Sequence, residues 1–335
     1  MYRMKFKCFD GHTCGNPVRL VTNNHPDLKG ERMSEKRIDF VQNHDHIRRG
    51  LMFEPRGHDM MSGSFIYPSS DEKVDFGILF IETSGCLPMC GHGTIGTVTL
   101  GLEHGIIKPK NDGSLRIEVP AGMIKVNYEM NAGKVDWVKI ENVASFLHSE
   151  ALTLTDEYLG ELQFDVSYGG NFYAIFDPQT NFKGFEHFSE SDLIMHAKRI
   201  RAQINVDYPN RFVHPEDDSI HGVSHVLWTG APSEGATARN AVFYGDKAID
   251  RSPCGTGTSA RMAQWYSKGK LKKGDQFVHE SIINSTFEGE IISETKVGDY
   301  DAIIPSIKGW AKCYGENTIT INPDDDPYAF GFQVI

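Results

Sequence analysis

The chain has few cysteines, no long apolar run and no cluster of basic residues. Six cysteines scattered over 335 residues do not make a disulfide scaffold, which favours a reducing compartment, and we expect a cytoplasmic protein. The longest apolar run, Phe76–Ile81, is strand-sized and far short of the ~20 residues that a membrane-spanning helix needs. The N-terminus lacks the continuous apolar stretch of a signal peptide, and its alternating side chains predict a first strand over residues 1–10.

Positive charge is also scarce. The formal net charge is -11, and nucleic-acid binding needs a basic surface that this sequence does not supply. The Gly-Lys-Ser/Thr signature of a phosphate-binding loop does not occur. We therefore expect a small-molecule substrate, with neither nucleic acid nor membrane as a partner.

The secondary-structure pattern predicts an α+β protein. With 335 residues the chain exceeds the usual size of one hydrophobic core, so two domains are expected. Short alternating or apolar runs bounded by turn residues predict many strands, interrupted by four helices. One helix is expected over roughly Gly30 to Leu51, and another begins near Ser189, where Ser189 and Asp192 form a capping pair. Representative strands are Ser64–Tyr67, Phe76–Thr83, Leu115–Val119, Phe172–Phe176, Val223–Trp228, Thr286–Ile292 and Thr318–Ile321.

The other two predicted helices follow a repeated motif. Residues 88–94 read Pro-Met-Cys-Gly-His-Gly-Thr, and residues 252–258 read Ser-Pro-Cys-Gly-Thr-Gly-Thr. The spacing between Cys90 and Cys254 also relates Gly105 to Gly269, so the copies agree in length as well as in motif. We expect two halves: residues 1–135, completed by a returning C-terminal strand near 318–335, and residues 136–317.

The paired cysteines predict acid–base chemistry at a carbon atom. A cysteine at a helix N-terminus has its pKa lowered from ~8.5 by the helix dipole and the unpaired N–H groups. Inverting a stereocentre needs a base on one face of the carbon and an acid on the other, which one thiolate and one thiol can provide. Cys90 and Cys254 are therefore the candidate catalytic pair.

The residues around each cysteine are candidates for substrate binding. Glycines at a helix start let a ligand approach the backbone closely, and the first N–H groups can bind a carboxylate. An ammonium or imino group needs an acceptor, for which Asp250, four residues before Cys254, is the nearest candidate. His225 is interpreted with equal weight as a core histidine or a site residue.

Other interpretations of these residues stay open at lower weight. Zinc could be bound by Cys86, Cys90 and His92, joined by His12, His225 or Cys254, but that set leaves the second motif without a purpose. A cysteine hydrolase would need one nucleophilic thiol and no matched second thiol. Cys8, Cys86 and Cys313 are interpreted as small core residues, and Cys14 leans the same way. We expect neither a metal nor a cofactor.

Three segments resemble the proline racemase and 4-hydroxyproline epimerase family: residues 11–19, 89–96 and 250–260. The resemblance implies a fold similar to diaminopimelate epimerase, with two pseudo-symmetric halves that each wrap strands around a central helix and an active site in the cleft between them. It also implies a cofactor-independent mechanism with Cys90 and Cys254 as the acid/base pair. The implied substrate-binding residues are Gly91, His92, His225, Asp250, Gly255 and Thr256.

The resemblance also narrows the reaction. The family includes 3-hydroxyproline dehydratases, which replace one catalytic cysteine with a hydroxyl residue; this chain has both cysteines, so epimerisation or racemisation is preferred. The small Gly93 is more similar to the hydroxyproline epimerases, which implies reversible conversion of trans-4-hydroxy-L-proline to cis-4-hydroxy-D-proline. Proline racemisation and a non-catalytic imino-acid-binding protein are the alternatives. The expected oligomeric state is a monomer or a homodimer.

Overall fold

The computed structural model describes residues 3–334, and Cα proximity divides the chain into two compact units. The first unit comprises Met1–Ile140 and Gly309–Ile335, and the second comprises Glu141–Lys308. Both are mixtures of strands and helices, as predicted for an α+β protein. The expected N-terminal strand is β1, Met4–Thr13; residues 1 and 2 of that prediction, and residue 335 of the predicted first half, lie outside the described residues.

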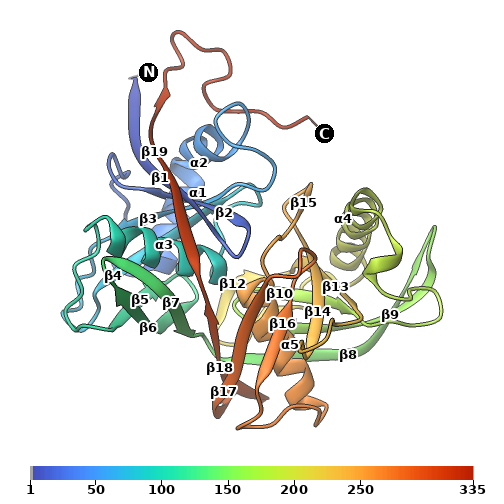
Figure 1. The fold of residues 1–335 in the computed structure, drawn as a ribbon. Coiled ribbons are helices and arrows are strands. Elements are labelled where there is room, and N and C mark those ends of the chain that lie inside the picture. Colours follow the sequence, from blue (N-terminus) through green and yellow to red (C-terminus); the bar gives the residue numbers. More distant parts are fainter. Residues whose placement is uncertain (1–2, 335) are drawn as a thin grey trace. The chain divides into compact units, whose positions relative to one another are not determined.

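The strands of the first unit pair in a characteristic order. From β19 through β1, β2, β3, β4 and β5 to β6, successive pairs are antiparallel, antiparallel, parallel, antiparallel, parallel and antiparallel. Figure 1 shows the C-terminal β19 beside β1, as the register of the pair requires. The bounds are β2 Asn16–Val21, β3 Ser62–Tyr67, β4 Phe76–Glu82, β5 Ser114–Val119, β6 Gly122–Asn131, β7 Lys134–Glu141 and β19 Ala311–Ile321.

The second unit repeats this order. From β8 through β9, β10, β13, β14 and β16 to β17, the pairs have the same directions in the same sequence. β17 then pairs with β18, and β18 pairs with β8, so this series of strands closes on itself. The bounds are β8 Ser145–Asp156, β9 Gly160–Tyr168, β10 Phe172–Phe176, β11 Val213–His214, β12 Asp217–His221, β13 Val223–Gly230, β14 Ala238–Tyr244, β15 Ala248–Ile249, β16 Phe277–Glu280, β17 Thr286–Val297 and β18 Tyr300–Gly309.

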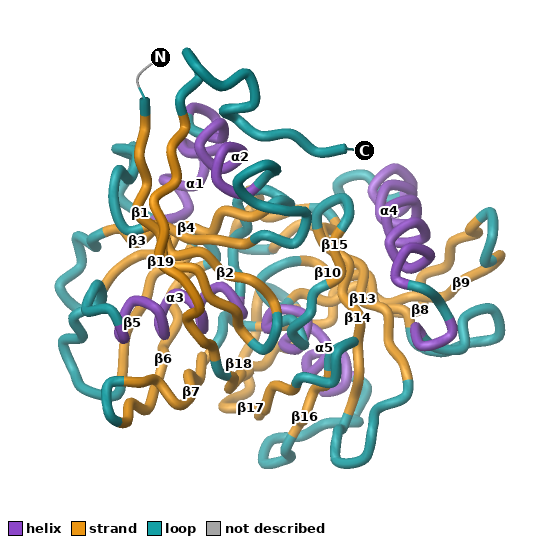
Figure 2. The backbone as a smooth tube through the Cα atoms, turned by 45° about the horizontal axis from the view of Figure 1, so that its top comes forward, coloured by secondary structure: helices purple, strands orange, loops and turns teal. Residues whose placement is uncertain are grey.

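Each unit has one helix that is buried on all sides over most of its length. These are α3, Gly91–Glu103, and α5, Gly255–Ser267, each of 13 residues, and they begin directly after the repeated cysteines. Every residue of α3 from Gly91 to Leu102 is buried. A helix that is enclosed by strands needs small or apolar residues around its whole circumference, and the Gly-, Thr- and Ala-rich sequences supply them. Figure 2 shows both helices among the strands of their own units.

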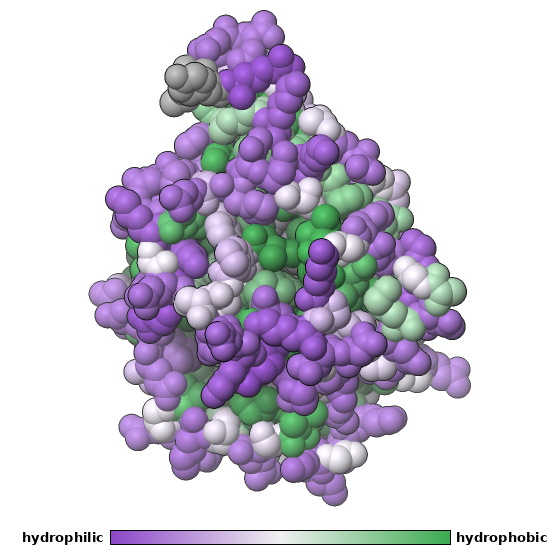
Figure 3. All heavy atoms as spheres, turned by 90° about the vertical axis from the view of Figure 1, so that its left-hand side faces the viewer, coloured by the Kyte–Doolittle hydropathy of each residue, from purple (hydrophilic) through white to green (hydrophobic). Residues whose placement is uncertain are grey.

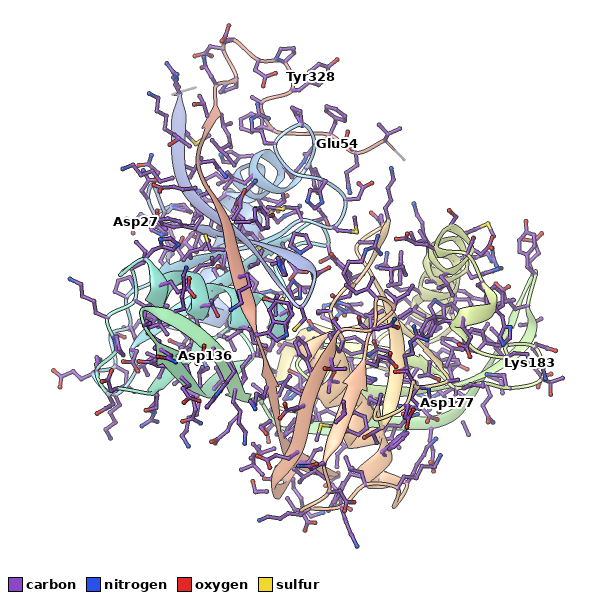
Figure 4. All side chains as sticks on the ribbon, in the orientation of Figure 1. Asp27, Glu54, Asp136, Asp177, Lys183 and Tyr328 are labelled. Carbon is purple, nitrogen blue, oxygen red and sulfur yellow. The ribbon has the colours of Figure 1, made fainter. Side chains whose placement is uncertain are left out.

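Arg261 on α5 is the charged exception in the buried stretch, and it is paired. Its Nη2 donates to Asp177 Oδ1 at 2.6 Å, and Thr229 Oγ1 donates to the same oxygen at 3.1 Å. Asp177, labelled in Figure 4, directly follows β10. The ion pair therefore ties α5 to the ends of two neighbouring strands and satisfies a charge that would be costly to bury alone.

Of the other two predicted helices, one is confirmed and one is wrong. α4, Glu190–Asp207, begins at Ser189 with the predicted capping box, in which Ser189 Oγ accepts from Asp192 N at 3.2 Å. The single helix expected over residues 30–51 is wrong: the structure has α1, Met33–Asn43, and α2, Asp45–Met52, separated at His44. His44 has φ -129° and ψ 5°, which interrupts the helix. A short 3-10 helix, η1, spans Phe185–His187.

Figure 3 shows hydrophilic side chains over most of one face, with apolar side chains in patches between them. Within residues 3–334, no helix is long and apolar enough to cross a membrane.

Candidate active site

Cys90 lies at the N-cap of α3, and its sulfur accepts a hydrogen bond from the first turn of that helix. The backbone N–H of Gly93 donates to Cys90 Sγ at 3.3 Å, and Thr94 N closes the first helical turn on the Cys90 carbonyl at 2.9 Å. Cys90 is 3% exposed. A sulfur in this position receives the positive end of the helix dipole, which favours the thiolate.

The His92 side chain contacts the same sulfur. Its Nδ1 lies 3.4 Å from Cys90 Sγ, and its Nε2 lies 3.0 Å from the amide nitrogen of Asn16. Because that amide nitrogen donates, Nε2 is the acceptor and the ring proton is on Nδ1, directed toward the sulfur. Thr13 Oγ1 donates to the His92 carbonyl at 2.8 Å. The β1–β2 turn therefore fixes both the tautomer and the position of this histidine.

A buried carboxyl group completes the surroundings of Cys90. Glu82 ends β4, and its side-chain oxygens accept from Ser62 Oγ at 3.1 Å and Ser84 Oγ at 3.3 Å. Burial raises the pKa of this carboxyl. One ligand atom each from Glu82, Cys90 and His92 lie within 4.8 Å of one another. We call Cys90, His92, Asn16 and Glu82 the first thiol site.

Cys254 occupies the corresponding place before α5 with a different backbone. Its φ is 63°, in the left-handed region that few residues other than glycine adopt, whereas φ of Cys90 is -140°. The strained residue is held by its neighbours: Cys254 N donates to Ser252 Oγ at 3.2 Å, and Ser252 N and Oγ both donate to Asp250 Oδ1 at 2.8 Å. Backbone strain of this kind is typical of functional sites.

A tyrosine from β10 contacts the second sulfur. Tyr173 OH lies 3.3 Å from Cys254 Sγ and 2.5 Å from Thr256 Oγ1. Asn171 Nδ2 donates to Thr256 Oγ1 at 3.3 Å, and the His225 ring stacks on Tyr173 with centroids 4.7 Å apart. We call Cys254, Asp250, Tyr173, Thr256 and His225 the second thiol site. The predicted residues Asp250, His225 and Thr256 thus lie in one neighbourhood with Cys254.

The expected lowering of the Cys254 pKa is wrong. Burial raises the pKa of this thiol well above its ordinary value, and the nearby Asp250 carboxylate raises it further, against the lowering effect of the Tyr173 hydrogen bond. Cys254 is 6% exposed and packs in an apolar cluster with Tyr173 and Ala260. Desolvation of the charged form therefore outweighs the helix terminus here.

Gly257 and Gly93, each three residues after its cysteine, leave space for the sulfur. A Cβ built on Gly93 would lie 2.9 Å from Cys90 Sγ, and one on Gly257 would lie 3.1 Å from Cys254 Sγ. Both distances are shorter than ordinary contacts. The second glycine of each motif therefore lets the sulfur fold back over the first helical turn, which is an additional reason for the spacing beyond access of a ligand to the backbone.

The other four cysteines lie outside the two thiol sites. None of the six cysteines forms a disulfide, and burial raises the pKa of Cys8 and of Cys86 to about 12. Cys14 is buried at the β1–β2 turn, with its Sγ 3.5 Å from the Trp310 carbonyl oxygen. Cys8, Cys14 and Cys86 are therefore buried, as the structural interpretation expects, whereas Cys313 is only partly buried.

One cluster in the described part of the chain has the donor types of a metal site. It consists of Glu82, Cys90 and His92, and not of the set with Cys86 that the sequence suggested. In the structure His92 Nδ1 lies 3.4 Å from Cys90 Sγ, and the Glu82 oxygens accept from serine hydroxyls. These contacts account for the positions of the three side chains without an ion.

Sequence reasoning missed three residues of the thiol sites. Tyr173 carried no signal, because a tyrosine inside a strand is ordinary. Asn16 lies in the segment 11–19 that carried the family resemblance, but no role was assigned to it. Glu82 offered a weak signal as the first charged residue after an apolar strand and only eight residues before Cys90.

Comparison with known proteins gives a consistent result over the full chain. The family model described as proline racemase matches residues 8–333. A 4-hydroxyproline 2-epimerase from Shewanella loihica is 60% identical over 336 residues, covering 100% of both chains.

Two solved structures have the same fold. A hydroxyproline epimerase from Agrobacterium vitis, solved with bound trans-4-hydroxy-L-proline, has a TM-score of 0.89 and 27% identity, covering 98% of this chain and 96% of that one. A probable proline racemase from Agrobacterium radiobacter, solved with bound carbonate, has a TM-score of 0.90, 28% identity and the same coverages. The predicted fold class is confirmed.

Proposed function

Because the chain belongs to the proline racemase family, we propose that it is a cofactor-independent isomerase that epimerises 4-hydroxyproline at the α-carbon. The observation that carries this proposal is a cysteine at the start of the buried helix in each of two units that share one order of strand pairing. The 60% identity to a 4-hydroxyproline 2-epimerase supports the choice of substrate. The reversible reaction connects trans-4-hydroxy-L-proline and cis-4-hydroxy-D-proline.

The two sulfurs divide the proton transfers between them. In one direction the Cys90 thiolate forms an S–H bond with the α-proton, and the electron pair of the broken C–H bond stays on the α-carbon next to the carboxylate. The Cys254 S–H bond then breaks and its proton joins the opposite face of that carbon. A backbone N–H three residues on, from Gly93 or Gly257, donates to each sulfur. Cys90 is the first base because its sulfur also contacts the His92 ring. Cys254 starts as the thiol because burial and the nearby Asp250 raise its pKa.

The helix starts provide the substrate-binding groups. Backbone N–H groups of Gly91, His92, Gly255 and Thr256 in the first turns of α3 and α5 bind the carboxylate, because such groups have no partner within the helix. Fixed donors at the carboxylate also stabilise the charge that develops during deprotonation. Asp250 and His225 meet the ring nitrogen and the ring substituents. A cytoplasmic location and a monomeric or homodimeric state stay predictions.

The reaction is tested in heavy water. Incubation with trans-4-hydroxy-L-proline should give cis-4-hydroxy-D-proline carrying deuterium at the α-carbon, detected by chiral chromatography and mass spectrometry. A parallel incubation with proline at the same concentration separates an epimerase from a proline racemase. Substrate binding without any α-proton exchange, with the thiols shown to be reduced, would refute the proposal and favour a binding protein.

The assignment of the cysteines is tested by serine substitution. Cys254→Ser should reduce epimer formation by about 10²–10⁴-fold, because an alcohol is a far weaker acid than a thiol at this position. The matched control is Cys313→Ser, which changes a partly exposed cysteine outside both thiol sites and should leave turnover unchanged. Equal turnover of the Cys254→Ser enzyme and the wild type would exclude Cys254 as the acid.

A further inference from the structure

The two thiol sites differ most in the groups that surround the matched sulfurs. Cys254 lies against a phenol, with Tyr173 OH 3.3 Å from Sγ. Cys90 lies against an imidazole and a carboxyl group, because His92 Nδ1 is 3.4 Å from Sγ and Glu82 belongs to the same cluster of donor atoms within 4.8 Å. A carboxyl group is buried near each sulfur, but the two have different contacts. Asp250 accepts from Ser252 N and Oγ, whereas Glu82 lies with a thiol and an imidazole in one cluster. Neither the repeat nor the two-thiol reaction explains why these three groups are gathered at one site.

Glu82 is well fixed and almost fully enclosed. It is 1% exposed, and its register partner on β3 is Ser62, whose hydroxyl donates to Oε1 at 3.1 Å. Ser84 Oγ donates to Oε2 at 3.3 Å. Burial raises the pKa of the carboxyl, and its hydrogen bond with Cys90 acts in the opposite direction. A buried carboxyl in this setting keeps a proton more readily than an exposed one.

Two arginines near Glu82 each donate to a backbone carbonyl. Arg48 on α2 donates from Nη1 to the Glu82 backbone carbonyl at 2.6 Å, and its Nε donates to Asp45 at 2.6 Å. Arg37 on α1 donates to the Cys86 carbonyl at 2.6 Å. Among the described residues, the titratable and charged groups near this carboxyl include Cys90 and His92 on or before α3, Cys86 in the preceding loop, Arg48 with Asp45 on α2, and Arg37 on α1.

We infer that Glu82 is a positioning residue that shares one proton with Cys90 and thereby keeps this sulfur available as a thiolate. The pair holds the proton either as S–H with a carboxylate or as a thiolate with a carboxylic acid donating to it. In the second form the sulfur is the base for the α-proton; when it takes that proton the S–H bond forms and the carboxyl keeps its own. The net charge of the pair then changes by one, and no other acceptor is needed.

The catalytic role of Glu82 rests on the proposed function, but the sharing of a proton between Glu82 and Cys90 can be tested without it. Two strongly coupled groups titrate in two macroscopic steps that belong to the pair. The thiolate of Cys90 should therefore form in two steps as the pH rises. If Glu82 only supported the local structure, its replacement would change the reactivity of Cys90 by the same factor at all pH values. The number of titration steps would then stay unchanged.

The experiment follows alkylation of Cys90 by iodoacetamide between pH 4 and pH 11, with the peptide carrying Cys90 quantified by mass spectrometry. We expect two steps in the wild type and one step in Glu82→Gln, which keeps the size of the side chain. At pH 7 the variant should react about tenfold more slowly, equivalent to a shift of one pKa unit. The kcat/KM of the variant should fall by a similar factor and recover toward high pH.

The matched control is Glu118→Gln, which changes a carboxylate of the same unit that accepts from Met33 N at 2.9 Å; its alkylation profile should equal that of the wild type. One step in the wild type, or identical profiles for wild type and Glu82→Gln, would overturn the inference. So would stoichiometric zinc in the purified protein whose removal by a chelator exposes Cys90 to alkylation. Two steps without any epimerisation would refute the proposed function and leave the proton sharing intact.

Discussion

Replacing Gly257 by alanine tests whether the space that this glycine leaves for the sulfur controls catalysis. The new Cβ would lie 3.1 Å from Cys254 Sγ, 3.2 Å from Cys254 Cβ and 3.3 Å from Tyr173 Cε1. Ordinary contacts are about 3.5–4.0 Å, so the three neighbouring atoms have to move by at least about 0.2–0.4 Å. The movement is resisted because Tyr173 is fully buried and hydrogen-bonded to Thr256 at 2.5 Å.

Two opposing free-energy contributions, the helix preference of alanine and the cost of overpacking, decide the effect on stability. Alanine inside a helix is favoured over glycine by about 0.8–1.0 kcal/mol, whereas overpacking a core costs about 1–3 kcal/mol. The free energy of unfolding of Gly257→Ala should therefore fall by only about 0–2 kcal/mol. Activity should suffer more, because a misplacement of about 1 Å at a reacting group can cost about 10²-fold. For a shift of about half that size we expect kcat to fall roughly tenfold.

The assay compares kcat for epimerisation, from chiral chromatography of initial rates, with the free energy of unfolding from urea titration. The control is Gly289→Ala, whose Cβ would lie 2.8 Å from Met262 Sδ, a flexible side chain on α5. This variant should lose stability in the same range while kcat stays within about twofold. A Gly257→Ala enzyme with wild-type kcat, or equal losses of kcat in both variants, would refute the reasoning.

Two further predictions concern titration. Tyr173→Phe removes the hydroxyl that lowers the pKa of Cys254, so the alkaline limb of the kcat/KM profile should move to higher pH, with a stability loss of about 1 kcal/mol; an unmoved limb would contradict the role of the phenol. His279 is fully buried, and desolvation lowers its pKa from 6.5 to about 3. The unfolded chain therefore binds a proton below pH 6.5 that the folded chain does not, and stability is lost as the pH falls through that range. Between pH 8 and pH 5 the free energy of unfolding should fall by about 2 kcal/mol for this reason. Urea titration of His279→Asn at both pH values should not show this fall. The same pH dependence in the variant and the wild type would exclude a contribution from His279.

The repeated motif allowed the two central helices to be predicted. The sequence did not predict which residues the tertiary structure brings together around them. The motif around Cys90 and Cys254 gave the starts of α3 and α5, since both helices begin at the next residue. β18 was missed because Pro305 interrupts its pattern, and the structure accommodates this proline next to a bulge between Ile291 and Ser293 of β17. The break at His44 lies within a sequence that otherwise predicts one helix.

The candidate site shows the same limit. The sequence indicated which cysteines match but not how their surroundings differ. Tyr173 is 81 residues from Cys254 in the sequence, and Glu82, although close to Cys90 in the sequence, belongs to no motif. The positive φ of Cys254 was equally hidden, since nothing in the motif distinguishes its backbone from that of Cys90. The pKa of Cys254 depends on how deeply the residue is buried, which only the packed structure shows.

The pairing of β1 with β19 has a consequence for the order in which the protein can form during synthesis. The second unit is one continuous segment, Glu141–Lys308, whereas the first unit needs residues from both ends of the chain. A ribosome delivers the N-terminal residues first, yet β1 has to wait for Ala311–Ile321 before that edge is paired. The middle of the chain can therefore complete its fold before its beginning does, and until then the nascent protein exposes an unpaired strand edge to its surroundings.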